Sequence, residues 1–246
     1  MANRFVTALA DQPRRLTMAT VVGMAAIGWI WLIAVVIDEG LSEALMPAME
    51  SNVSVSGLAL GFAMWVAMVF AMMLPTAAPT FRAYADTIGR GTTTLIAGYT
   101  VVWLGASLLA MAIQTWLVHL GALAPHMAPA GMALSASILI AAGIYQFTPL
   151  KWACLLRCRN PRGAYVEDGA WSAFRIGLEE GLACLGCCWA MMAVMFAAGL
   201  MNLAAMALLG ALMGLEKLVS GVWLTYFLGV LLILAGVILA SGLVIG

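Results

Sequence analysis

Seven apolar stretches, separated by short polar segments, constrain this chain more than any other feature of its sequence. They cover residues 16–37, 57–80, 93–119, 131–149, 181–200, 201–215 and 222–244. About 20 mostly apolar residues cross the hydrocarbon core of a bilayer as a helix. The chain is 65% hydrophobic and only 9% charged, whereas soluble domains carry about 25% charged residues. The sequence therefore predicts an all-α, polytopic membrane helix bundle of about seven transmembrane helices, forming a single domain over residues 1–246.

The basic residues are sorted among the polar segments. If the N-terminus is cytoplasmic, the inner segments hold all 11 lysines and arginines and the outer segments hold none. Basic residues of membrane proteins concentrate on the cytoplasmic side. We therefore predict a cytoplasmic N-terminus, a basic inner loop at residues 151–180 and an acidic outer segment at residues 38–56. The expected surrounding is a lipid bilayer, and no basic stripe indicates a nucleic-acid partner.

A run of sulfur-bearing residues opens the fifth apolar stretch. Residues 179–195 read E-E-G-L-A-C-L-G-C-C-W-A-M-M-A-V-M and hold three of the five cysteines. On a helix, residues three and four apart share a face, so Cys184, Cys187 and Cys188 are expected to point the same way, with Met191 one turn further on. Thiols and thioethers favour soft metals such as Cu(I). The alternative is that these cysteines and methionines are ordinary packing residues.

The predicted topology brings the remaining sulfur ligands to the same membrane face. Cys154 and Cys158 follow the inner end of the fourth stretch, and Met72 lies at the inner end of the second. Disulfides are rare in the cytosol, so we expect reduced thiols that converge in space. The spacings C-x3-C and C-x2-C-C differ from the usual zinc pattern. Copper is therefore the expected metal and zinc, which prefers four tetrahedral ligands, is the alternative.

Neighbouring cysteines cannot all face one ion equally well. Cys187 and Cys188 diverge by about 100° on a helix. We therefore predict that one of the two is dispensable for metal binding, and that it is Cys187.

The charged residues close to the cysteines can be interpreted in two ways. Glu179 and Glu180 stand near Arg175, which fits either an ion pair at a helix start or a supporting shell around a metal. Arginines close to the cysteines favour the thiolate form that binds metal, or serve only to contact lipid headgroups. Glu216 and Lys217 are expected in a turn of little consequence.

On the outer side, a weak copper site is a further alternative, with His119, His126 and Met127.

Three segments resemble a family of bacterial proteins described as predicted metal-binding integral membrane proteins, some of them labelled copper chaperones. They are M-M-L-P-T-A-A-P at 72–79, G-I-Y-Q-F-T-P-L-K-W-A-C-L-L-R-C-R-N-P at 143–161, and C-L-G-C-C-W-A-M-M at 184–192 with the G-L-M-N and L-E-K-L that follow. The resemblance implies metal binding by the five cysteines and a bacterial inner membrane location. It also implies roles for a set of polar residues, namely Tyr145, Gln146, Lys151, Glu216 and Lys217.

The function expected from these patterns is binding and handling of a soft metal, with delivery to a larger membrane enzyme. A membrane thiol–disulfide redox protein and an accessory subunit of a larger membrane complex are the alternatives. The sequence contains no hydrolase, metalloprotease, P-loop or dinucleotide-binding motif, so an enzyme is the less favoured reading.

Overall fold

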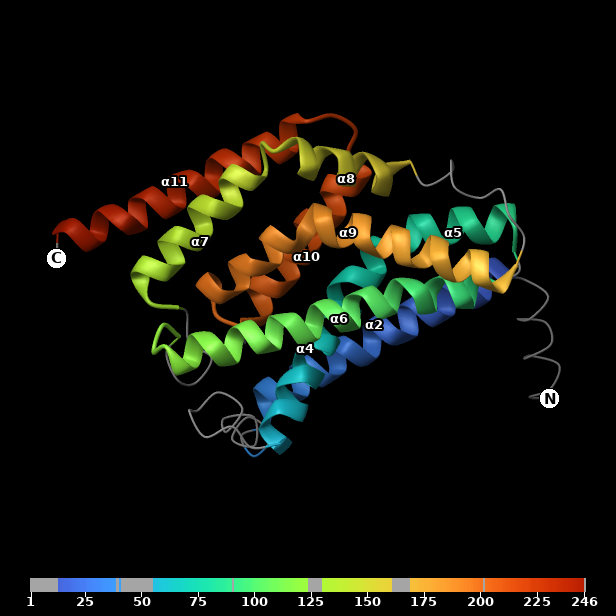
Figure 1. The fold of residues 1–246 in the computed structure, drawn as a ribbon, viewed down its shortest axis with the longest axis horizontal. Helices are drawn as coiled ribbons and strands as arrows, with labels where there is room; N and C mark the ends of the chain where they lie inside the picture. Colours follow the sequence, from blue (N-terminus) through green and yellow to red (C-terminus); the bar gives the residue numbers. More distant parts are fainter. Residues whose placement is uncertain are drawn as a thin grey trace.

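The computed structural model is helical in the part of the chain that it describes, which is residues 13–245 without 39, 41–54, 90, 124–129, 161–168 and 201. No strand occurs within these residues, so the all-α prediction is confirmed. Figure 1 shows the helices, which are α2 (Pro13–Ile37), α4 (Val55–Thr76), α5 (Ala78–Thr87), α6 (Thr92–His119), α7 (Met132–Tyr145), α8 (Pro149–Arg159), α9 (Ala170–Ala198), α10 (Leu203–Leu218) and α11 (Trp223–Ile245).

Five of these helices are long and apolar enough to cross a membrane, namely α2, α4, α6, α9 and α11. A sixth span results if α7 and α8, which meet at an angle of 65°, together form one broken span. Helix α10 has only 16 residues, below the length that a full crossing needs. The long apolar helices are compatible with a membrane protein, but the predicted count of seven spans is not confirmed.

Three predicted boundaries are wrong because helices begin where polar loops were expected. The second apolar stretch ends at Thr76, and helix α5 follows after one residue, with Pro79 in its first turn. The fourth stretch ends at Tyr145 rather than at residue 149. The predicted basic inner loop at 151–180 is largely helical, since α8 and the first turns of α9 occupy it. A proline suits the first turn of a helix, where its missing N–H has no partner to lose.

The helices pack in pairs in which glycines allow close contact. Helix α6 lies along α9 and runs in the same direction, whereas α7 lies antiparallel to α11 and α2 antiparallel to α4 (Figure 1). A Cβ at Gly98 of α6 would collide with the carbonyl oxygen of Phe174, and a Cβ at Gly177 of α9 with that of Leu95. Small residues at such crossings allow backbones in membranes to approach closely. The α6–α9 pair therefore fixes the position of the cysteine-bearing helix.

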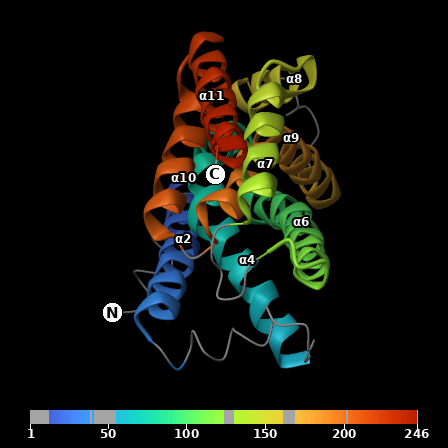
Figure 2. The same ribbon diagram turned by 90° about the vertical axis from the view of Figure 1, so that its left-hand side faces the viewer.

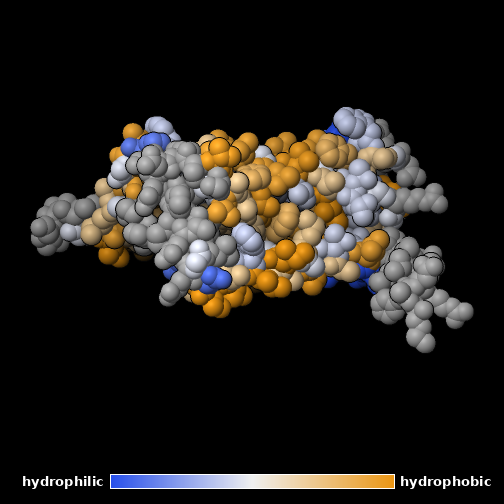
Figure 3. All heavy atoms as spheres, turned by 90° about the horizontal axis from the view of Figure 1, so that it is seen from below, coloured by the Kyte–Doolittle hydropathy of each residue, from blue (hydrophilic) through white to orange (hydrophobic). Residues whose placement is uncertain are grey.

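The α7–α11 pair lies on one side of the bundle, away from α2 and α4 (Figures 1 and 2). Helix α2 begins and α11 ends at opposite ends of the long axis (Figure 1). Hydrophobic side chains cover much of the middle of the face seen in Figure 3. Large aliphatic side chains stand exposed along α2 and α11, including Ile30 at 66% and Ile238 at 70%. Such exposed apolar surface suits contact with lipid rather than water.

The ion pairs show which ends of the helices meet. Arg14 at the start of α2 approaches Asp86 of α5 at 3.9 Å, and Arg157 of α8 contacts Glu179 of α9 at 2.7 Å. Which end is cytoplasmic stays a prediction. The predicted acidic outer segment lies almost entirely outside the described residues, as do His126 and Met127, whereas His119 is exposed at the end of α6.

Candidate metal centre

Helix α9 carries three thiols on one buried face. Cys184, Cys187 and Cys188 are each at most 2% exposed, and their sulfur atoms lie within 4.8 Å of one another. Cys184 Sγ and Cys188 Sγ are 4.0 Å apart, one helical turn from each other. The thiols of Cys187 and Cys188 both donate to the carbonyl oxygen of Cys184, at 3.1 and 2.7 Å. The shared face predicted from the spacing is confirmed.

Helix α8 brings a fourth thiol to this face. Cys158 Sγ lies 3.8 Å from Cys187 Sγ, so the predicted convergence of the two cysteine groups is confirmed for this pair. The sulfur of Cys154, one turn earlier on α8, packs at Gly186, where a Cβ would collide with it. A residue larger than glycine at 186 would displace this sulfur. All five cysteines are free, as the expectation of reduced thiols requires.

A methionine other than the predicted one approaches the thiols. Met73 Sδ of α4 lies 3.6 Å from Cys188 Sγ. Met72, its neighbour, instead lines a cleft between α4 and α10, because successive residues on a helix point about 100° apart. Met191 is buried on α9. The sequence pointed to Met72, whereas the structure places its neighbour Met73 against the thiols.

Two further polar groups contact Cys184. The hydroxyl of Tyr99 lies 3.0 Å from its sulfur and also donates to the carbonyl oxygen of Met73 at 3.2 Å. The ammonium of Lys217 lies 3.0 Å from the same sulfur and donates to Thr76 Oγ1 at 2.8 Å. A positive charge beside a thiol favours the thiolate, which is the form that binds metal. Sequence reasoning missed Tyr99, which stands within an apolar stretch with no motif around it.

Glu216 and Lys217 were expected in an unimportant turn, and that expectation is wrong. Both lie in the last turn of α10 and both are buried. Glu216 Oε2 forms a 2.8 Å ion pair with Lys151 of α8, whose ammonium also donates to the carbonyl oxygen of Cys187 at 2.6 Å. Charges buried in an apolar interior need such partners. One ion pair therefore ties α8, α9 and α10 together beside the thiols.

Arg159 completes the connection between α8 and α10. Its guanidinium donates twice to the carbonyl oxygen of Glu216, at 2.9 and 2.6 Å, and once to that of Gly221 at 3.0 Å. The last carbonyls of a helix lack partners within it, and they attract cations. The arginine thus holds the end of α10 in place, which keeps Lys217 against Cys184.

Of the two glutamates before the cysteines, one lies at the surface and the other in the interior. Glu179 is partly exposed and lies within reach of Arg157, at 2.7 Å, and of Arg175, at 3.9 Å. Glu180 is 3% exposed and pairs with Arg157 at 3.3 Å. Both carboxylates are thus members of one charge cluster at the α8–α9 contact. Glu180 also lines a small cavity with Cys158, Cys184 and Lys217.

The polar residues that end α7 support α9 from the other side. The hydroxyl of Tyr145 donates to the carbonyl oxygen of Gly186 at 2.5 Å, and its ring meets that of Trp189 edge-on. Gln146 is 2% exposed, and both atoms of its amide lack a hydrogen-bond partner among the described residues. Tyr145 therefore positions the α9 backbone between the cysteines. Nothing in the structure explains why the amide of Gln146 is buried.

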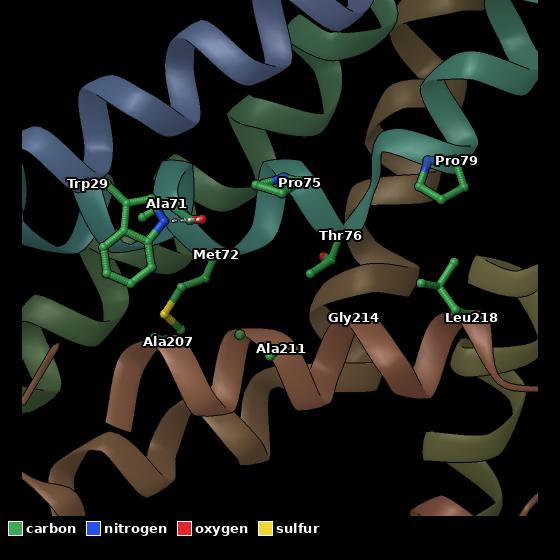
Figure 4. A pocket seen from close by; sticks show the side chains of 11 residues that line it. Trp29, Ala71, Met72, Pro75, Thr76, Pro79, Ala207, Ala211, Gly214 and Leu218 are labelled. Carbon is green, nitrogen blue, oxygen red and sulfur yellow. Dashed lines mark hydrogen bonds between the residues drawn. The ribbon is translucent and has the colours of Figure 1, made fainter. Parts of the chain in front are cut away.

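A cleft of about 340 Å³ lies between α4 and α10 (Figure 4). Ala207, Ala211 and Gly214 line its α10 side, and Met72 and Thr76 line its α4 side. Pro75 lacks the N–H that would bond the carbonyl oxygen of residue 71 in a regular helix. The indole of Trp29 donates to that oxygen instead, at 3.2 Å. The cleft reaches Thr76, whose hydroxyl oxygen accepts a hydrogen bond from the ammonium of Lys217.

Helices long enough to cross a membrane and a cluster of four thiols, three of them buried, together define a class of helical proteins suited to soft-metal binding. A comparison with protein-family models then identifies the family: residues 62–239 match the model of PpoB2, described as a copper chaperone. The chain belongs to this copper chaperone family. Comparisons with curated proteins and with solved structures gave no significant match.

Proposed function

We propose that this protein binds Cu(I) within the thiol cluster of Cys158, Cys184, Cys187 and Cys188, in which Cys187 stays the thiol predicted to be dispensable. The observation that carries the proposal is the convergence of these sulfurs from two helices, with Met73 and Lys217 in contact with them. Cu(I) accepts thiolate and thioether ligands, and it tolerates low coordination numbers, so it needs no fixed set of four. Four thiols would also satisfy zinc, but the copper chaperone family favours copper.

We place the protein in the bacterial inner membrane as a multi-pass protein, with its thiols at the cytoplasmic face. The long apolar helices and the sorted basic residues support this placement. The role that follows is delivery of copper to a larger membrane enzyme. Exchange of metal between proteins requires a thiol that a partner can reach. Cys158 is less buried than the three α9 cysteines, which suits it to that step.

A thiol–disulfide function is the second candidate, because Cys158 Sγ and Cys187 Sγ are only 3.8 Å apart. It predicts a reversible disulfide between these two residues and no dependence on Cys184. An accessory subunit of a larger complex is a third candidate, and it predicts that no single thiol matters for metal content.

Anaerobic titration of the purified protein with Cu(I), in competition with a chromophoric chelator, separates these candidates. Wild type should bind copper tightly, and Cys184→Ser should lose most of it. Ala190→Ser is the matched control, because it places a hydroxyl at another buried position of α9. Equal copper binding by wild type and Cys184→Ser would refute the proposal. Loss of binding in both serine variants would trace the effect to helix α9 rather than to the thiol.

A further inference from the structure

Helix α4 contains a proline one turn after Ala71, and this leaves the carbonyl oxygen of Ala71 without its helical partner. In a regular helix that oxygen accepts a hydrogen bond from the N–H of the fourth residue on, but this residue is Pro75. Ala71 is 4% exposed, and a buried carbonyl group needs a donor. The indole Nε1 of Trp29 supplies it from α2, at 3.2 Å (Figure 4).

A close contact between α2 and α4 brings this indole to the carbonyl group. A Cβ at Gly28 would lie 2.7 Å from the carbonyl oxygen of Ala67 and 2.8 Å from the amide nitrogen of Ala71, so the contact requires a glycine. Trp31, two residues beyond Trp29, is also packed against the core. Its Nε1, however, is buried without a hydrogen-bond partner among the described residues. The two tryptophans therefore differ in whether the indole N–H is used.

The turn of α4 that contains the proline also carries the thioether of the thiol cluster. Met73, two residues after Ala71, places its Sδ 3.6 Å from Cys188 Sγ. The carbonyl oxygen of Met73 accepts hydrogen bonds from the Tyr99 hydroxyl at 3.2 Å and from Thr76 Oγ1 at 2.9 Å. The backbone of this turn is thus held at two carbonyl groups, one at Met73 and one at Ala71.

We infer that Trp29 is a positioning residue of the metal centre, whose hydrogen bond to Ala71 holds the turn so that the thioether of Met73 faces the thiols. An indole N–H is a donor only, so Trp29 acts through the backbone of α4 and is not itself a ligand. Ala71 lines the cleft between α4 and α10. Without the indole donor, its carbonyl oxygen would turn toward another partner, and Met73 would move with it. The inference rests on the proposed function, because it assigns Met73 to a copper site.

Two measurements on the full-length protein in detergent test this inference. Competition with a chromophoric chelator gives the affinity for Cu(I), and mass spectrometry gives the rate of amide hydrogen exchange in the segment 72–77. Trp29→Phe keeps an aromatic ring but loses the donor. It should lower the affinity about two- to threefold and speed the exchange about fivefold, since one hydrogen bond is lost. Trp31→Phe is the matched control and should change neither, because its indole N–H has no partner among the described residues.

A second background separates the lost hydrogen bond from a general loss of packing at Trp29. Pro75→Ala restores the N–H that bonds the carbonyl oxygen of Ala71 in a regular helix. In this background, Trp29→Phe should change neither the affinity nor the exchange rate. In a Met73→Leu background, Trp29→Phe should still speed the exchange but should lower the affinity no further.

A loss of affinity in Trp29→Phe that persists in either background would overturn the inference, and so would an equal loss in Trp31→Phe. Unchanged exchange of the segment 72–77 in Trp29→Phe would overturn it while leaving the proposed function intact. A wild type that binds no Cu(I) would instead refute the proposed function, and the role assigned to Trp29 would fall with it.

Discussion

Helix α9 presents two contrasting faces to the rest of the bundle. Cys184 and Cys188 point to a region with two buried lysines, two buried carboxylates and a buried tyrosine hydroxyl. Leu185, Trp189 and Met192 line an apolar groove, and no charged side chain is among the described residues that form it. The two faces are separated by only the 100° between successive helical residues. The contrast on this helix is thus between a buried face next to charged groups and an apolar face that opens to the outside at Trp189, which is 48% exposed.

The difference shows how a thiol cluster can exist inside an apolar bundle. On the thiol face, charges are paired or hydrogen-bonded across α8, α9 and α10. On the groove face, the side chains are almost all apolar. The thiol side is therefore predicted to depend on its charges for stability, and the groove side to depend on them little. Four substitutions sharpen this comparison, and the first has the largest expected effect.

Glu216→Leu should destabilise the protein by about 3–5 kcal/mol, because it leaves the ammonium of Lys151 buried without its carboxylate. The double variant Lys151→Met with Glu216→Leu should recover most of this loss, since no lone charge remains. Unfolding in mixed micelles, followed by circular dichroism, measures both. If the double variant were as unstable as the single one, the ion pair would not be what holds this face together.

Cys158→Ser should lower the affinity for Cu(I) by about tenfold or more, or roughly 1.4 kcal/mol. Cys154→Ser should have a smaller effect, because that sulfur packs at Gly186, whereas the sulfur of Cys158 lies 3.8 Å from that of Cys187. Competition with a chromophoric Cu(I) chelator measures both affinities. The reverse order of effects would place the metal nearer to Cys154 than the geometry indicates.

Tyr99→Phe should lower the free energy of unfolding by about 1 kcal/mol, since the hydroxyl contacts both Cys184 Sγ and the carbonyl oxygen of Met73. Tyr226→Phe is the control, at a tyrosine of α11 that is 44% exposed. Thermal unfolding of the two variants in the same detergent gives the comparison. Equal effects would show that the hydroxyl of Tyr99 adds nothing specific to the thiol face.

Met73→Leu should have the smallest effect, a reduction of Cu(I) affinity by a few-fold, roughly 1 kcal/mol or less. The thioether lies beside Cys188 but the thiolates are the stronger ligands. Met68→Leu, at a fully buried methionine of the same helix, should leave the affinity unchanged. An identical response in the two variants would remove Met73 from the site.

Much of the fold and part of the site could be predicted from the sequence. Hydropathy located the five long helices, and helical periodicity placed Cys184, Cys187 and Cys188 on one face. Hydropathy failed where polar helices continue beyond the apolar stretches, as in α5 and α8. It also misplaced Glu216 and Lys217, because a charged pair looks like a turn until Lys151 and Cys184 are seen beside it. Contacts made across three helices leave no local pattern in the sequence.

The most direct test of the central claim is X-ray absorption spectroscopy at the copper edge on the protein loaded with one equivalent of Cu(I). The thiol cluster predicts a first shell made of sulfur atoms alone, and a changed shell with fewer sulfurs in Cys184→Ser. A shell of nitrogen or oxygen atoms, or a spectrum that is identical in wild type and Cys184→Ser, would contradict the assignment of copper to these cysteines.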